Sequence, residues 1–204
     1  MSWPSCFCCP CLEHAAWYGH PAAGIAFLPG DVDPDDVDAG LPERVRWLAG
    51  VCLGAVGRYR TAARWLAPGG EPAGSLAASC LASHLRQLGR HAEAEPLDRL
   101  ALSTATDPEA RADALIGLVA DAVGRNELAL ARDRLHSATQ RMVAVTTDYA
   151  RWRARVRQEW VTAETALLAG EAPRAVEIGR TAQRISRTAN AYRHTVKSTL
   201  VLGV

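Results

Sequence analysis

The sequence has almost no lysine and no long apolar run. Lys197 is its only lysine, so arginine provides nearly all of the positive charge. No stretch of about 18 or more apolar residues occurs, and we therefore expect no membrane-spanning helix. The 23 basic and 22 acidic residues leave a net charge of +1, which lacks the strongly basic balance typical of nucleic-acid-binding domains. A nucleic-acid partner is accordingly not expected.

Catalytic and targeting motifs are also missing. The sequence has no nucleophile elbow, phosphate-binding loop, zinc-protease helix or dinucleotide-binding glycine pattern. Its scattered histidines have no serine or carboxylate at a recognisable catalytic spacing. We therefore expect neither enzymatic activity nor a cofactor. No basic segment followed by an apolar one opens the chain, so the cytoplasm, where cysteines stay reduced, is the expected compartment.

Helical periodicity is present from Leu41 onward, interrupted by short turns that contain glycine. Pro42, Pro108 and Pro173 suit a first helical turn, because an N–H there would have no partner in any case. No segment alternates in the manner of a strand. The pattern predicts an all-α protein with about nine helices. Their expected ranges are 42–56, 59–67, 74–88, 91–105, 108–123, 126–145, 147–169, 172–187 and 189–203.

The chain before this helical region has a different character. Residues 1–40 are rich in cysteine near the start and in aspartate between Asp31 and Asp38, where proline and glycine break any periodicity. We expect them to form a largely irregular N-terminal segment, and residues 41–204 to form a separate helical domain. Cys52 and Cys80 lie inside helical patterns and are expected in the core.

The N-terminal cysteines are the one candidate metal site. The set consists of Cys6, Cys8, Cys9 and Cys11. Thiolates can hold Zn²⁺ or Cu(I), but the two pairs with zinc-knuckle spacing interleave within one short stretch. Three interpretations stay open for this segment: a metal site, a reduced tail without fixed structure, and translated sequence upstream of the true start with no selected role.

An internal repeat is the strongest pattern. A glycine ends a helix at Gly57, Gly89, Gly124 and Gly170, and an alanine follows five residues later at Ala62, Ala94, Ala129 and Ala175. A small residue precedes each glycine by seven positions, at Gly50, Ala82, Gly117 and Ala163. A glycine favours the left-handed conformation that closes a helix, and small residues allow paired helices to approach closely. These residues are predicted to lie where the two helices of each hairpin pack against each other.

The repeat resembles the tetratricopeptide family, whose period is about 34 residues. Two features depart from it: the interval from Gly124 to Gly170 is longer, and the family's large aromatic residues are mostly absent. The resemblance implies a right-handed superhelix of antiparallel helical hairpins, a TPR-like α-solenoid with about four repeats and a terminal half repeat. It also implies a concave groove, lined by the first helix of each unit, that binds an extended peptide or a helix.

The groove residues expected from this register come from four helices. They are Arg46, Leu53, Ser79, Arg86, Asp113, Asp121 and Glu159. Arg151, Arg153, Arg155 and Arg157 form a basic run with Trp152 and Trp160. Arg153 and Arg157 share one helix face, and Arg151 and Arg155 share the other. A solvated surface, a partner-binding groove and a nucleic-acid contact remain open for this run. The last ten residues look like the first helix of a further unit, and this apolar end predicts a homodimer through the C-terminal helix, burial by a partner, or a truncated gene product.

The predicted function is that of a non-enzymatic protein-interaction scaffold with a protein or peptide partner. One alternative is a regulatory or sensory helical module, or a fragment of a bacterial transcriptional regulator, because TPR-like helical domains often follow DNA-binding or nucleotide-binding regions in such proteins. A second alternative is a metal-binding protein that uses the N-terminal cysteines.

Overall fold

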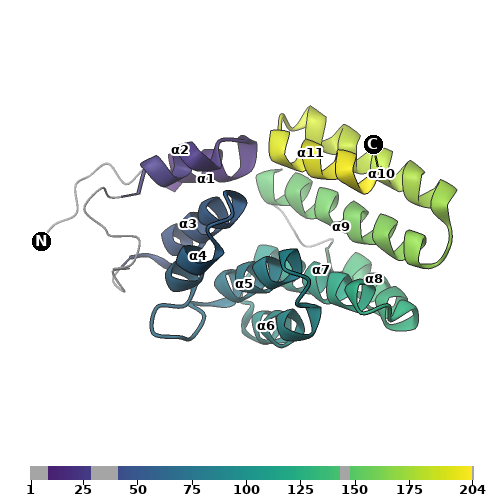
Figure 1. Ribbon diagram of the computed structural model, residues 1–204, viewed down its shortest axis with the longest axis horizontal. Helices are drawn as coiled ribbons and strands as arrows, with labels where there is room; N and C mark the ends of the chain where they lie inside the picture. The colour runs from purple at the N-terminus through teal and green to yellow at the C-terminus, as the bar shows by residue number, and fades with distance from the viewer. Residues whose placement is uncertain (1–8, 29–40, 143–147, 204) are drawn as a thin grey trace, which may run out of the picture.

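The computed structural model describes residues 9–28, 41–142 and 148–203, and these residues form helices and no strand (Figure 1). The prediction of an all-α protein is confirmed. None of the described helices is both long enough and apolar enough to cross a membrane. The helices are α1 (Cys9–Tyr18), α2 (Pro21–Ala26), α3 (Glu43–Ala55), α4 (Tyr59–Leu66), α5 (Ser75–Gln87), α6 (His91–Thr104), α7 (Pro108–Gly124), α8 (Leu128–Arg141), α9 (Asp148–Leu168), α10 (Ala172–Thr188) and α11 (Tyr192–Val201).

The odd-numbered helices form a layer that closes on itself. Each odd-numbered helix packs against the next one, from α1 to α11, and α11 packs back against α1. Figure 1 shows α1 and α11 side by side, although they lie at opposite ends of the sequence. Each even-numbered helix packs on the odd-numbered helices before and after it. We call α1, α3, α5, α7, α9 and α11 the odd-helix layer.

The expectation that residues 1–40 are largely irregular is wrong for α1 and α2. Leu12, Ala15 and Ala16 recur at helical spacing and are buried, as is Trp17. Both helices pack on α3, so this segment continues the helical layer. The cysteines and prolines among these residues obscure the helical spacing in the sequence. Pro21 in fact stands in the first turn of α2, where a proline needs no hydrogen-bond donor.

Small residues lie where paired helices touch. Ala62, Ala82, Ala94, Ala163 and Ala175 are all buried. A Cβ atom at Gly50 would overlap the side chain of Leu66 in α4, and one at Gly117 would overlap the carboxylate of Asp98 in α6. These seven predicted packing residues therefore occupy helix contacts.

The eighth predicted packing residue, Ala129, is exposed on α8. The reason is that Gly124 belongs to α7, and Asn126 takes the left-handed conformation two residues later, with a φ angle of 62°. The alanine five residues after Asn126 is Ala131, which is fully buried. The expected turn at Gly124 is thus displaced by two residues, because asparagine also tolerates this conformation.

Candidate functional site

The predicted groove residues lie mostly inside the molecule. Leu53, Ser79, Asp113 and Asp121 are at most 4% exposed, and the side chain of Arg86 is 9% exposed. Arg46 is half-buried. These residues do not line an open groove, because the odd-helix layer closes and turns the faces that carry them into the interior. Glu159 is the exception: it borders a shallow hollow of about 460 Å³ between α8 and α9, beside Arg155.

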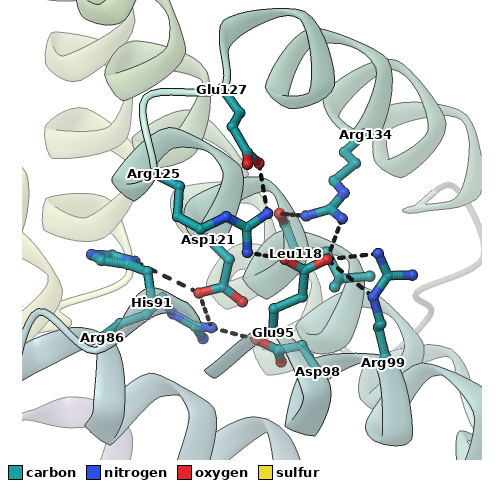
Figure 2. Close-up of polar contacts among 10 residues, drawn as sticks. All are labelled: Arg86, His91, Glu95, Asp98, Arg99, Leu118, Asp121, Arg125, Glu127 and Arg134. Atoms are coloured by element: carbon teal, nitrogen blue, oxygen red, sulfur yellow. Dashed lines mark hydrogen bonds and ion pairs between the residues drawn. The ribbon is translucent and has the colours of Figure 1, made fainter. Parts of the chain in front are cut away.

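Two of the predicted residues, Arg86 and Asp121, meet in a buried ion-pair cluster, which Figure 2 shows, and a third, Ser79, joins it through Asp98. Arg86 of α5 donates to Asp98 of α6 and, over 3.2 Å, to Asp121 of α7. Ser79 donates to Asp98 over 3.1 Å, and His91 Nδ1 lies 3.6 Å from Asp121 Oδ1. Both aspartates are fully buried. Asp98 was not predicted, since it lies on a second helix that the groove hypothesis did not include.

Two carboxylates share this single buried cation. Burial raises the pKa of Asp98 to about 7, although Arg86 acts to lower it, and the nearby Asp121 raises it further. Burial would lower the pKa of Arg86, but Asp98 and Asp121 outweigh it and raise that pKa. The arrangement joins α5, α6 and α7. The Arg86 guanidinium and the two carboxylates interact with one another in the interior.

A second polar cluster centres on Glu95 of α6 (Figure 2). Its carboxylate accepts from Arg99 and Arg134, each over 2.6 Å, and from Arg125. Arg134 also donates to the carbonyl of Leu118 over 2.8 Å. This cluster ties α6 to α7 and α8. Glu95 and Arg99 have the i,i+4 spacing of one helix face, but Arg125 and Arg134 reach Glu95 from other parts of the chain, so no local pattern predicts the whole cluster.

A third cluster contains two of the four α9 arginines, Arg153 and Arg157, whose surroundings the sequence left open. Arg153 of α9 is 4% exposed and donates to Asp113 over 2.7 Å and to Glu109 over 3.1 Å. Arg157 also donates to Asp113. Burial opposes ionisation of Asp113, but Arg153 and Arg157 outweigh it and lower the pKa of this carboxyl. The face of α9 with Arg153 and Arg157 therefore points into the interior, whereas Arg151 and Arg155 on the other face are exposed.

Aromatic residues from α1, α3, α9 and α11 fill the space next to this third cluster. The Arg153 guanidinium carbon lies 4.6 Å from the centroid of the Trp17 ring, and Trp17 lies 5.3 Å from Trp47 between ring centroids. The His194 ring lies 4.9 Å from Trp152 and 5.5 Å from Trp160. These contacts attach both α1 and α11 to α9, so residues from the two ends of the chain pack against the same helix.

One Cys–His contact among the described residues resembles a nucleophile and its base. His84 Nε2 lies 3.7 Å from the Cys80 sulfur. Burial raises the pKa of the Cys80 thiol to about 12 and lowers the pKa of His84 to about 4. A nucleophilic cysteine needs the opposite shift of its thiol pKa, because the thiolate is the reactive form. This pair is therefore suited to packing and unsuited to covalent catalysis.

The candidate metal site is described only in part. Cys6 and Cys8 lie outside the described residues, and Cys9 and Cys11 belong to α1. Cys11 is half-buried. Within the described part of the chain, no group of three or more histidine, cysteine, aspartate or glutamate side chains is placed to hold a metal ion.

An exposed apolar stripe runs along α11. Tyr192, Val196 and Leu200 stand four residues apart and are 69%, 42% and 70% exposed. Residues at this spacing lie on one helix face. The other exposed large hydrophobic residues of the described chain are distributed over five further helices or their ends. The sequence predicted an apolar C-terminal helix, but it did not predict which of its residues would be exposed.

Comparison with protein-family models, with curated proteins and with solved structures finds no match for this chain.

Proposed function

We propose that this chain is a non-enzymatic interaction scaffold built from tetratricopeptide-like helical repeats, which associates with a second copy of itself through α11. The observation that carries the proposal is the stripe of Tyr192, Val196 and Leu200. Three large side chains on one helix face, all left in solvent, mark a surface that gains stability when it is covered.

The repeat assignment is supported by the helix contacts. Left-handed residues at Gly57, Gly89, Asn126 and Gly170 each separate an odd-numbered helix from the even-numbered helix that packs on it. The residue five positions later is a buried alanine in all four cases. A unit of two helices cannot cover its own apolar face, and stacking of several units does so.

A second copy is the occupant that the chemistry of α11 favours. The two cations of this helix are engaged within the chain: Arg193 donates to the carbonyl of Ala16 over 3.2 Å, and Lys197 lies over the Trp160 ring. The stripe itself is uncharged. Two antiparallel copies of α11 would place Val196 against its counterpart and Tyr192 against Leu200, which satisfies the self-complementarity of a two-fold interface.

The expected association is weak. A stable interface buries about 800 Å² per partner, and a helix of ten residues offers less than this by itself. We therefore expect a dimer whose population rises with protein concentration.

Sedimentation velocity over a wide concentration range tests this proposal. Leu200→Glu should abolish the concentration dependence, because a charge would enter the apolar contact. The matched control is Leu100→Glu, which changes an exposed leucine on α6 and should dimerise as the parent does. A parent protein that stays monomeric at every concentration would contradict the dimer.

We do not propose an open peptide-binding groove, because most of the residues that were expected to line it are buried. The alternative of a regulatory module stays a prediction, and α11 is equally the surface through which such a module would act.

A further inference from the structure

The side of α11 that faces α1 and α9 carries two cations without a carboxylate ion-pair partner in the described chain. Arg193 and Lys197 are one helical turn apart. Arg193 donates to a main-chain carbonyl, that of Ala16, and the Lys197 ammonium lies 4.4 Å from the centroid of the Trp160 ring. Glu164 acts on Lys197 electrostatically from beyond ion-pair distance. Two largely desolvated positive charges thus lack the anion that normally accompanies them.

Two nitrogen atoms beside these cations also lack partners. Trp152 Nε1 and His194 Nδ1 are buried and have no hydrogen-bond partner among the described residues. Their rings meet edge to face with centroids 4.9 Å apart, so the two groups are neighbours. Buried polar groups in folded proteins are almost always hydrogen-bonded, and two unpartnered ring nitrogens next to two cations without a carboxylate partner indicate a missing acceptor.

The charges around His194 also favour an anion at this place. Burial lowers the pKa of His194, and four nearby cations lower it further: Arg193, Arg153, Arg157 and Lys197. The imidazole is therefore neutral. Arg153 and Arg157 pair with Asp113, and Arg153 also pairs with Glu109. The excess positive charge near His194 therefore comes from Arg193 and Lys197, which have no carboxylate at ion-pair distance among the described residues. The neutral tautomer that carries its proton on Nδ1 would be a hydrogen-bond donor.

We propose that this region between α9 and α11 binds a small free oxyanion of the phosphate type. Arg193 and Lys197 supply the opposing charge, and Trp152 Nε1 and His194 Nδ1 donate hydrogen bonds to its oxygen atoms. The Trp152 and Trp160 rings both contact the His194 ring, and α11 packs against α1 and α9. A peptide segment would have to separate these packed helices to reach the donors, so a free ion is the ligand that this packing favours. The site adjoins the stripe on α11 and is independent of dimer formation.

Inorganic phosphate is the probe, titrated against the full chain at constant ionic strength with chloride as the replaced anion. Binding is followed by isothermal titration calorimetry. A second readout is the rate at which an amine-specific acylating reagent modifies Lys197, the only lysine of the chain. Peptide mapping separates this product from the acylated N-terminus. We expect saturable binding of phosphate and slower modification of Lys197 as the site fills.

Two tryptophan variants form a matched pair. Trp152→Phe keeps an aromatic ring but removes the unpartnered N–H, and it should weaken phosphate binding by about tenfold or more, because a hydrogen bond to a charged group is lost. Trp65→Phe removes another buried and unpartnered indole N–H, in α4, and should leave phosphate binding unchanged. Lys197→Gln should also weaken binding, and circular dichroism establishes that each variant is folded.

Several outcomes would overturn the proposal. Phosphate that stabilises all variants equally, without saturation, would be acting as a general salt. Equal binding by Trp152→Phe and the parent would place any phosphate site elsewhere. An acidic peptide that binds more tightly than phosphate and is weakened by Trp152→Phe would show that the ligand is a peptide carboxylate, which contradicts a free ion.

Discussion

The guanidinium of Arg193 in α11 donates a hydrogen bond of 3.2 Å to the main-chain carbonyl of Ala16 in α1, although the two residues are 177 positions apart in the sequence. Ala16 lies in the last turn of α1, where carbonyl groups have no partner within the helix. Arg193 therefore satisfies a free carbonyl and places a cation at the negative end of the α1 dipole. This contact closes the odd-helix layer.

Arg193→Gln should loosen α1 without unfolding the rest of the chain. The loss of a charged hydrogen bond at a helix end predicts amide exchange in Cys9–Tyr18 that is about tenfold faster or more. Hydrogen exchange with mass spectrometry measures it. Exchange in α6 serves as the internal control, because α6 does not touch α1 or α11. Equal protection of α1 in both proteins would show that Arg193 does not hold it.

Gly117→Ala should destabilise the protein far more than Gly124→Ala. The added methyl group at position 117 meets the fully buried carboxylate of Asp98, which cannot move without breaking its contact with Arg86. We expect a loss of about 2 kcal/mol or more. At position 124 the methyl group meets the partly exposed ring of His91, which can turn away, and alanine improves helix propensity. Urea unfolding of both variants measures the difference, and similar losses would contradict this packing.

Asn126 should behave as a left-handed turn residue. Asn126→Gly should be neutral or stabilising, because glycine adopts a positive φ angle without strain. Asn126→Ala should cost about 1 kcal/mol, since a Cβ atom is disfavoured there. Thermal unfolding distinguishes the two substitutions. If Asn126→Ala and Asn126→Gly are equally stable, the turn does not lie at this residue.

Asp113→Asn should be strongly destabilising. It removes the carboxylate that Arg153 and Arg157 share in the interior, which leaves two buried cations short of negative charge. Breaking a buried ion pair in this way costs about 3 to 5 kcal/mol. Asp133→Asn on the exposed side of α8 is the matched control and should change the free energy of unfolding little. A small effect of Asp113→Asn would mean that water reaches the arginines.

Stability should fall in mild acid because His84 is buried as the neutral base. Its pKa is lowered to about 4, chiefly by burial, whereas an unfolded histidine titrates near 6.5. Between these values the unfolded chain binds a proton that the folded chain does not, so the stability present above about pH 6.5 is lost as the pH falls. From about pH 7 to about pH 5 the loss from His84 is about 2 kcal/mol.

Urea unfolding at the two pH values tests this, with His84→Phe as the variant. Asp98 acts in the opposite direction, because its pKa is raised, so the difference between variant and parent isolates His84. His84→Phe should reduce the acid-induced loss, and His136→Phe, at an exposed position of α8, should not. An identical pH dependence in His84→Phe and the parent would contradict a neutral buried His84.

Local signals in the sequence identified all nine of the helices from α3 to α11, because periodicity, glycine turns and prolines act within a few residues of one another. The same signals located seven of the eight small packing residues. They misplaced the third turn, since asparagine as well as glycine tolerates the left-handed conformation, and the structure has this conformation at Asn126.

The candidate sites depend on contacts that no local pattern encodes. Asp98 meets Arg86 from another helix, and Arg193 meets α1 from the far end of the chain. A helical wheel predicts which residues share a face, but it does not predict whether that face is open or closed. The sequence by itself determined the helices from α3 to α11, three of the four repeat turns and the apolar character of α11. Only the tertiary structure decided that the expected groove is filled, because the closure of α11 on α1 is a long-range contact that replaces solvent with packed side chains.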